Sequence, residues 1–264
     1  MPYPHLIAKI YYSPICITVQ KFMAIHAVME SRLSGGARLD AGDPPPRVED
    51  WNIARDGSTA IIPIRGLIDQ HHVKTMSEGP TCDLDDVKAA IDISEQDPSI
   101  DRVLFNIDTP GGSATGVPET GRKIFGMRKQ TVAFTDGEAN SAGMWLASQA
   151  KRFYATPSST LGSVGVWSAY TDLTAKMKKD GVKINSVHAG RYKLMGSWWK
   201  PMADEERAML QAQVDKLHAE FKTAVNNIRP VEAKFLEGQV FDGEEATQIG
   251  MVDGLVEDIS ELLN

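Results

Sequence analysis

The sequence predicts an α/β domain organised around a parallel β-sheet. From residue 59 onward, short apolar runs rich in β-branched residues alternate with segments of helical periodicity, the order typical of parallel βαβ units. The 264-residue chain is 42% hydrophobic and 24% charged, which is the composition of an ordinary globular protein. This length suits one large domain or two small ones.

The predicted elements follow one another regularly along the chain. Strands are predicted at 59–68, 101–108, 131–136, 152–156 and 182–188. Helices are predicted at 84–97, from the glycine turn at 111–112 to about 129, at 141–150 and at 202–228. In the last helix, apolar residues recur at steps of three and four, which predicts a single buried stripe. The stripe consists of Leu210, Val214, Leu217, Phe221, Val225 and Ile228.

Residues 1–47 are predicted to be an N-terminal arm with a proline-rich linker, and residues 48–264 to be the folded domain. The arm contains an apolar stretch and a weakly amphipathic segment at 23–33, and the linker carries consecutive prolines at 44–46. Two interpretations of the arm stay open. It packs on the body or on a partner, or it is a poorly ordered terminus.

Composition and charge exclude several classes of protein. The net charge of −7 argues against a general affinity for nucleic acid. Two cysteines, Cys16 and Cys82, are too few for a disulfide framework, and the six histidines form no common zinc pattern, so we expect no metal and no cofactor. Lys9 and Pro14 interrupt the apolar N-terminal stretch, so we expect neither a signal peptide nor stable membrane insertion, and a soluble protein of the cytoplasm.

Two neighbouring strand exits carry residues suited to hydrolysis, and ligands of parallel sheets bind at such exits. At the first, Gly111 and Gly112 follow a proline and can direct backbone N–H groups into one space, as an oxyanion hole requires. At the second, Ser141 opens a predicted helix beside Ala142, whose N–H can complete the hole. The alternatives are a tight turn for the glycines and an ordinary N-cap for the serine.

A serine nucleophile needs a base, and two candidates follow the strand predicted at 182–188. No histidine lies between His72 and His188, so the usual chain order of a serine–histidine–acid triad is absent, although His188 itself stays open. Lys193 is the other candidate. A lysine of ordinary pKa, about 10.4, is almost fully protonated at neutral pH and needs an apolar pocket to act as a base. Material for such a pocket is offered by Leu194, Met195, Trp198 and Trp199. The alternative is a surface lysine in a basic turn.

The order and spacing of six motifs resemble the SppA family of serine–lysine peptidases (signal peptide peptidase A), from Thr59 to the C-terminus. The segment IPIRGLI resembles the family's opening strand, and FNIDTPGG resembles its glycine turn. The segment ANSAGMWLAS resembles the segment that carries the family's nucleophile. The segment ATPSSTLGSVGV resembles the family segment that follows the nucleophile, and GRYKLMGSWW resembles its lysine segment. The segment GQVFDGEEATQIGMVDGL resembles the closing portion of the family. Each motif is weak by itself, whereas six in register are specific.

The resemblance implies a ClpP/crotonase-like fold of stacked ββα units, and it implies roles for individual residues. Ser141 occupies the nucleophile position and Lys193 the general-base position. Ser163 falls where the family places a hydroxyl that orients the lysine. The oxyanion-hole positions correspond to Gly111, Gly112 and Ala142.

Two departures from the family pattern affect this site. Ala142 replaces a family glycine, which is tolerable because the backbone N–H is the group that acts. The pair Trp198–Trp199 replaces a Pro-Phe pair, which changes the wall near the lysine and the expected substrate preference.

The resemblance also implies a serine endopeptidase with a serine–lysine dyad that cleaves proteins or peptides and forms homo-oligomers. Membrane-bound members carry an anchoring helix before the peptidase domain, whereas this sequence places an arm and a proline-rich linker there. That arrangement resembles the head-maturation proteases of tailed phages. We therefore expect a phage or prophage capsid-assembly protease, in the host cytoplasm or inside the procapsid, with capsid, scaffold and portal proteins as partners.

Three alternatives stay open. The first is a soluble bacterial SppA-type peptidase that degrades signal peptides or other peptides. The second is a crotonase-type acyl-CoA enzyme, which would share the fold and the oxyanion hole but needs a carboxylate at the reacting carbon that we cannot assign. The third is a non-catalytic capsid-assembly scaffold, against which the presence of both Ser141 and Lys193 argues.

Overall fold

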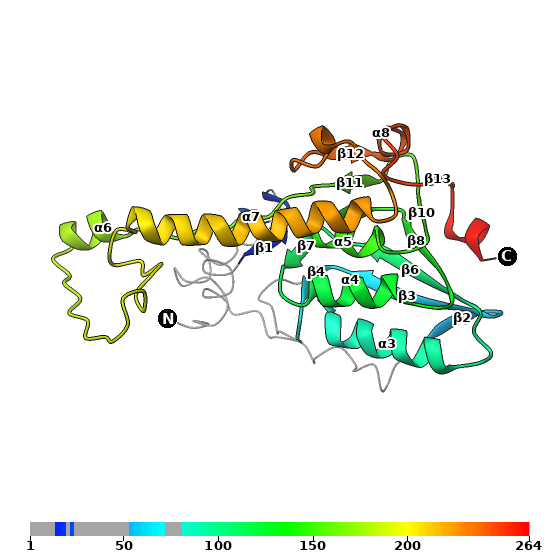
Figure 1. Cartoon of the computed structure of the whole chain (residues 1–264), viewed down its shortest axis with the longest axis horizontal. Helices are drawn as coiled ribbons and strands as arrows, with labels where there is room; N and C mark the ends of the chain where they lie inside the picture. The colour runs from blue at the N-terminus through cyan, green and yellow to red at the C-terminus, as the bar shows by residue number, and fades with distance from the viewer. Residues whose placement is uncertain (1–13, 20–21, 24–52, 72–80, 264) are drawn as a thin grey trace.

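A six-stranded sheet forms the centre of the computed structural model, which describes residues 14–19, 22–23, 53–71 and 81–263 (Figure 1). Its strand order is β13-β10-β8-β6-β3-β2. All strands run parallel except β2, which pairs antiparallel with β3 at one edge. The strands are β2 (Ala54–Asp56), β3 (Thr59–Arg65), β6 (Arg102–Asp108), β8 (Gln130–Thr135), β10 (Arg152–Ala155) and β13 (Gly254–Leu255). The predicted α/β class with a parallel sheet is confirmed.

Each long strand is followed by a short strand that leaves the central sheet. The short strands after β3, β6, β8 and β10 are β4 (Leu67–Asp69), β7 (Gly111–Ser113), β9 (Glu138–Asn140) and β11 (Thr160–Gly162). A second sheet has the order β1-β7-β4-β5, with β1 (Ile15–Ile17) and β5 (Thr81–Asp83) at its edges. A third sheet joins β9 and β11 to β12 (Val240–Asp242).

A helix returns the chain to the central sheet after β5, β7 and β9. These helices are α3 (Leu84–Gln96), α4 (Val117–Phe125) and α5 (Ala142–Ala147). The long strand, short strand and helix thus repeat along the chain, which is the stacked ββα arrangement of the ClpP/crotonase-like class. This part of the fold prediction is confirmed as well.

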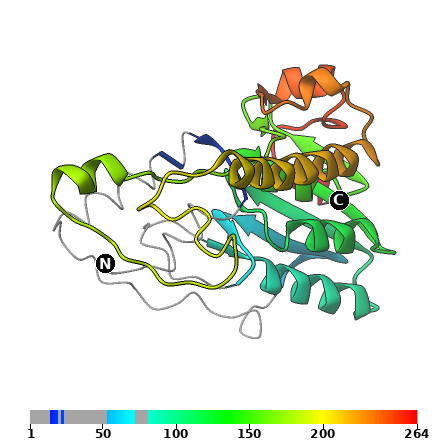
Figure 2. The same cartoon turned by 60° about the vertical axis from the view of Figure 1, so that its left-hand side comes forward.

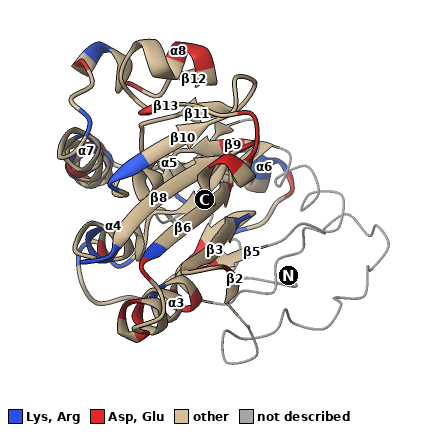
Figure 3. Cartoon of the chain, turned by 90° about the vertical axis from the view of Figure 1, so that its right-hand side faces the viewer, with Lys and Arg blue, Asp and Glu red and all other residues tan. Residues whose placement is uncertain are grey.

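The main core lies between the central sheet and the helices. Helices α3, α4 and α7 (Asp204–Asn226) run along one side of the sheet (Figure 3). Helix α5 is buried over its whole length, and its Trp145 ring stacks on Phe221 of α7 with 4.6 Å between ring centroids. Asp83 begins α3 as an N-cap, because its carboxylate accepts the Asp85 N–H at 2.8 Å.

The opposite face of the sheet is covered by the C-terminal segment. Leu104, Val132 and Phe134 form a second apolar cluster there, against Ile259 and Leu262 of the 3₁₀ helix η3 (Ile259–Leu262). The chain reaches this face through the 3₁₀ helix η2 (Ala233–Phe235), β12, α8 (Gly243–Gln248) and β13.

The prediction of a strand at 182–188 is wrong. Every residue from 181 to 191 is exposed, and the segment pairs with no strand in the described ranges. It follows the short helix α6 (Thr174–Lys179) and lies beyond the sheets, at the far end of α7 (Figures 1 and 2). The apolar-polar alternation of Val182, Lys183 and Ile184 suggested a strand, but alternation cannot supply the neighbouring strand that backbone N–H and C=O groups need.

The stripe predicted along 202–228 is buried only toward the C-terminal end of α7. Phe221 and Val225 are fully buried, whereas Leu210, Val214 and Leu217 are half-buried. The first turns of α7 extend past the edge of the central sheet (Figure 1), so the sheet does not cover the apolar residues at this end of the stripe.

The predicted arm is described only at residues 14–19 and 22–23. There it packs on the body, because β1 pairs antiparallel with β7. The remainder of the segment at 23–33 after Met23, and the proline run at 44–46, lie outside the described residues. The division of the chain at residue 47 therefore stays a prediction.

Candidate functional site

Ser141 lies in a strained backbone conformation between β9 and α5. Its φ is 54° and its ψ is −115°, a combination that non-glycine residues rarely adopt. Its side chain makes no capping hydrogen bond, so it is not the ordinary N-cap that the sequence left open. The residue is 1% exposed, and its Oγ has no hydrogen-bond partner among the described residues. A strained serine on a sharp strand-to-helix turn is one arrangement that presents a nucleophile, which makes Ser141 the candidate.

The glycine turn lies directly against Ser141. Gly111 has a φ of +102°, and a β-carbon built on it would lie 2.9 Å from the Ser141 Cβ. Gly112 pairs with Ile68 of β4, and a β-carbon there would lie 1.9 Å from the Ile68 carbonyl oxygen. No larger residue fits at either position without moving the backbone, so the turn requires both glycines.

The two glycine N–H groups do different work. The Gly111 N–H donates to Thr109 Oγ1 at 3.0 Å and is therefore used within the turn. Gly112 lies opposite Cys16 in the pairing of β7 with β1. Its N–H therefore belongs to the strand ladder and not to the hydrogen bonds within the turn. Of the two predicted oxyanion-hole glycines, Gly112 is thus the better placed donor for a peptide carbonyl.

Thr109 is a positioning residue that the sequence reasoning missed. Its hydroxyl accepts from the Gly111 N–H and donates to the Gly66 carbonyl at 2.5 Å, and its backbone is hydrogen-bonded to Glu138 and Asn140, the first and last residues of β9. It thereby joins the glycine turn to the strand that leads into Ser141. The signal was present, because Thr109 occupies the serine position of the family's D-S-P-G-G turn.

Ala142 and Gly143 begin α5 beside this turn. Ala142 is fully buried and is the first residue of the helix, where a backbone N–H has no partner within the helix. A β-carbon on Gly143 would lie 2.3 Å from the Thr109 Cγ2 atom, so the glycine lets α5 approach the end of β6. The structure therefore brings together Ser141, Ala142 and both predicted glycines.

Ser163 also lies beside Ser141. The Ser141 N–H donates to the Gly162 carbonyl at 2.9 Å, and Ser163 follows directly with a φ of 50°. The Ser163 N–H donates to the Gln239 carbonyl at 2.6 Å, which ties this turn to the loop before β12. The residue is half-buried.

The single chain does not bring Lys193 to Ser141. Lys193 is exposed on the segment between α6 and α7, and its Nζ makes no hydrogen bond or ion pair within the described part of the chain. His188, the other candidate base, is exposed on the same segment. Trp198 and Trp199 pack edge to face with 5.3 Å between their centroids and stay half-buried. Within the described part of the chain, the predicted serine and oxyanion-hole positions therefore lie together, whereas both candidate bases are exposed on another segment.

A model of peptidase family S49 matches residues 125–261, just over half of the chain. The chain belongs to this family, as the predicted resemblance to SppA-type peptidases implied. The matched range contains Ser141, Ser163 and Lys193.

Three relatives show how the chain compares with named proteins. Capsid assembly protease C of Escherichia phage lambda is 29% identical over 220 residues, covering 81% of this chain and 49% of the relative. The head-tail preconnector protein GP5 of Enterobacteria phage P21 is 29% identical, covering 75% and 40%. Protease 4 of Haemophilus influenzae is 23% identical, covering 79% and 34%. The chain thus spans half or less of the length of these relatives.

Solved structures that match this chain have low sequence identity and TM-scores below 0.5. The 1510-N membrane protease specific for a stomatin homolog from Pyrococcus horikoshii has 18% identity and a TM-score of 0.41, covering 78% of this chain and 76% of that one. An enoyl-CoA hydratase/isomerase from Marinobacter aquaeolei has 15% identity and a TM-score of 0.48, covering 81% and 73%.

No helix in the described ranges is both long enough and apolar enough to cross a membrane.

Proposed function

We propose that this protein is a serine endopeptidase in which Ser141 is the nucleophile and Lys193 the general base. The observation that carries the proposal is the state of Ser141 beside the glycine turn: its backbone is strained, its side chain is buried and caps no helix, and its Oγ has no hydrogen-bond partner among the described residues. Strain of this kind costs about 1–3 kcal/mol and persists mainly where function requires it. A serine with a purely structural role would cap the helix or turn its hydroxyl toward a partner.

The geometry supports an acyl-enzyme mechanism. Ser141 Oγ attacks the carbonyl carbon of the scissile peptide bond while its proton passes to the neutral amine of Lys193. The N–H groups of Gly112 and Ala142 stabilise the negative charge that develops on the carbonyl oxygen. The intermediate collapses, the C–N bond breaks, and the leaving amine takes the proton from Lys193. Water then attacks the acyl-enzyme with the same base and releases Ser141.

The remaining predicted residues support this chemistry indirectly. Ser163 lies one residue from the carbonyl that accepts the Ser141 N–H, which suits a hydroxyl that orients an incoming lysine. Gly111 acts by shaping the turn, because its N–H is bound to Thr109.

The base is best supplied by a second copy of the chain. Lys193 is exposed, every residue of the preceding stretch from 181 to 191 is exposed, and the first turns of α7 extend past the edge of the central sheet (Figure 1). A neighbouring protomer that covers the segment with Lys193 and the first turns of α7 would remove water from the lysine. Loss of water favours the neutral form of the amine. Self-association would then complete the site and switch the enzyme on.

We further propose a role in phage capsid assembly, with scaffold and capsid proteins as substrates. The similarity to capsid assembly protease C of phage lambda over 81% of the chain supports this role. The similarity to Protease 4 of Haemophilus influenzae keeps a bacterial SppA-type peptidase as the second candidate. Cleavage of the coat and scaffold proteins encoded beside this gene is compared with cleavage of signal peptides. Preferential cleavage of the coat and scaffold proteins would favour the role in capsid assembly, and preferential cleavage of signal peptides would favour the SppA-type peptidase.

The direct test of the activity uses a fluorophosphonate probe, which labels activated serine nucleophiles. We expect labelling of the oligomer at Ser141, located by peptide mapping, and none in Ser141→Ala. Peptide hydrolysis that survives in Ser141→Ala would contradict the assignment, and an oligomer that neither labels nor hydrolyses would favour the non-catalytic scaffold.

A further inference from the structure

Residues Ile15–Ile17 of the N-terminal arm form β1, an edge strand that lies on the glycine turn of the candidate active site. On one edge, β1 pairs antiparallel with β7, with Ile15 opposite Ser113, Cys16 opposite Gly112 and Ile17 opposite Gly111. On the other edge, Ile15 exchanges both backbone hydrogen bonds with Trp167, at 2.9 and 3.1 Å. We call the space between Gly111–Ser113 and Trp167 the strand groove.

The register places the Cys16 peptide unit on the glycine turn. Thr18 N–H donates to the Pro110 carbonyl at 3.2 Å, and Ala114 N–H donates to the Pro14 carbonyl at 3.4 Å. Hydrogen-bonded pairs alternate in an antiparallel ladder, so Cys16 and Gly112 are the bonded pair between these two. A β-carbon on Gly111 would lie 2.1 Å from the Cys16 carbonyl oxygen. The same β-carbon would lie 2.9 Å from Ser141 Cβ, so the Cys16 carbonyl and Ser141 meet at one point of the turn.

Side chains hold the arm in the strand groove from both faces. Cys16 is fully buried and packs with the main core. Ile15 and Ile17 point the other way and pack with Leu67 and Trp167. The Trp167 Nε1–H also donates to the Ile17 carbonyl at 3.0 Å. The groove therefore selects a small side chain opposite Gly112 and aliphatic side chains on both sides of it.

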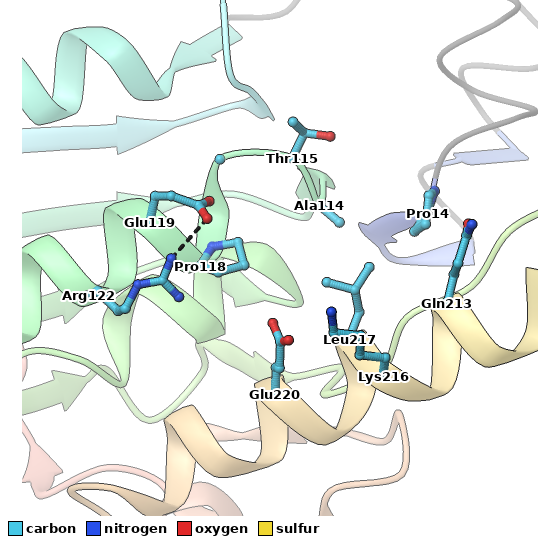
Figure 4. Close-up of a pocket in the computed structure, with 11 residues that line it drawn as sticks. Pro14, Ala114, Thr115, Pro118, Glu119, Arg122, Gln213, Lys216, Leu217 and Glu220 are labelled. Atoms are coloured by element: carbon cyan, nitrogen blue, oxygen red, sulfur yellow. Dashed lines mark hydrogen bonds and ion pairs between the residues drawn. The ribbon is translucent and has the colours of Figure 1, made fainter.

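A cavity adjoins the strand groove at Pro14. This cavity of about 520 Å³ lies between α4 and α7, with Pro14 at one wall and Leu217 at another (Figure 4). Glu119 and Arg122 form an ion pair at its rim. The cavity adjoins the end of the groove where a longer peptide would extend toward its N-terminus.

We propose that residues 14–18 are a built-in substrate mimic, which fills the strand groove and excludes peptides until the arm is released. The inference rests on the proposed peptidase function, because it takes the strand groove as the place where substrates bind. It also defines the preferred substrate, an extended segment with a small residue flanked by β-branched aliphatic residues, as in Pro14-Ile15-Cys16-Ile17-Thr18.

Competition by the arm has a defined kinetic consequence. A peptide binds only the fraction of molecules whose groove is open, so its apparent dissociation constant is the intrinsic value divided by that fraction. Weakening the arm should therefore lower the apparent KM, whereas a segment that merely stabilises the fold should not change it.

The test compares the full-length double variant Ile15→Asp/Ile17→Asp with the matched control Val19→Asp. The first adds carboxylates at two buried positions of the arm, and the second adds one at a position that is 57% exposed. For a peptide with the preferred pattern, we expect the apparent KM to fall at least about tenfold in the double variant and to stay at the wild-type value in the control. A KM within twofold of wild type in the double variant would overturn the proposal.

Release of the arm is measured independently by cysteine labelling. Cys16 and Cys82 are both buried, and burial raises the pKa of each thiol to about 12, so neither should react with iodoacetamide near pH 8 in the wild-type protein. In the double variant, we expect Cys16 to react at least about tenfold faster while Cys82 stays protected. Labelling of both cysteines would mean a lost fold. The variant Thr18→Pro, which removes the N–H donated to Pro110, would then replace the double variant.

A binding assay separates failure of this proposal from failure of the proposed function. The probe is a fluorescein-labelled peptide, Ser-Pro-Ile-Ala-Ile-Thr-Val, and its anisotropy is measured with proteins that all carry Ser141→Ala. We expect at least tenfold tighter binding when Ile15→Asp and Ile17→Asp are also present. Equal binding would overturn the arm proposal. Tighter binding without hydrolysis by any Ser141-containing protein would instead uphold the arm and contradict the peptidase.

Discussion

The backbone N–H of Ser141 donates to the carbonyl of Gly162 at 2.9 Å. This bond joins the turn that presents the candidate nucleophile to the turn that carries Ser163. The two turns belong to successive ββα units, so the site is built where equivalent short strands, β9 and β11, pair in parallel. Displacing either turn should therefore affect both hydroxyls.

Removing the Ser141 hydroxyl should abolish hydrolysis without lowering stability. Ser141→Ala deletes a buried oxygen that has no hydrogen-bond partner in the described ranges, and such an unsatisfied group costs about 1–3 kcal/mol of stability. Ser141→Gly also relieves the positive φ, offset by about 0.5–1 kcal/mol of chain entropy. We expect both variants to be inactive and to melt at or above the wild-type temperature, as measured by calorimetry. A clear loss of stability in both would mean that Ser141 has a structural role.

Lys193 should be required as a neutral amine. Lys193→Ala and Lys193→Arg should both reduce kcat by at least about 100-fold, because general-base catalysis is worth about 10²–10⁴ and arginine does not deprotonate. Lys183→Ala, an exposed lysine on the same segment, is the matched control and should keep its activity. If His188→Ala lost activity while Lys193→Ala kept it, the base would have to be reassigned.

The activity of the oligomer should rise with pH. The neutral fraction of a lysine grows as pH increases, so kcat/KM should increase on the alkaline side and follow the titration of one group in the free enzyme. The profile is measured with a short peptide between pH 6 and 10, with stability checked at each end. A profile that instead reaches its plateau below pH 7 would indicate a histidine base.

Mixing two inactive variants should restore activity if Ser141 and Lys193 act across protomers. In an oligomer with one lysine donated from each subunit to the next, random mixing of Ser141→Ala with Lys193→Ala gives intact sites at about a quarter of the positions. We expect recovery toward that fraction of wild-type activity after subunit exchange. Ser141→Ala mixed with Ser141→Gly is the control and should stay inactive. A fully active monomer in sedimentation would disprove the shared site.

Thr109 should control the oxyanion turn through its hydroxyl. Thr109→Val keeps the shape but leaves the Gly111 N–H without its acceptor, which should cost about 1–3 kcal/mol in stability and lower kcat more than it raises KM. Thr109→Ser restores the hydroxyl and should recover most of kcat, although it loses the methyl group that packs against Gly143. Equal kcat in Thr109→Val and wild type would contradict the positioning role.

The sequence by itself determined the parts of this protein that local patterns control. Alternating apolar runs and helical periodicity gave the parallel sheet and helix α3, because side-chain period reports burial within a single element. The glycines at 111 and 112 and the serine at 141 were located in advance, since backbone freedom and a helix start are also local properties. Family membership followed from the spacing of these motifs.

The tertiary structure decided everything that depends on a partner distant in sequence. It showed that Thr109 binds the glycine turn, that β1 lies between Gly112 and Trp167, and that the segment at 182–188 has no neighbouring strand in the described ranges. It also left Lys193 exposed on the segment between α6 and α7, whereas Ser141 is buried between β9 and α5. The physical reason is common to all four. Another segment of the protein supplies the hydrogen-bond acceptor, the neighbouring strand or the apolar wall that removes water. The residues adjacent in sequence do not indicate which segment that is.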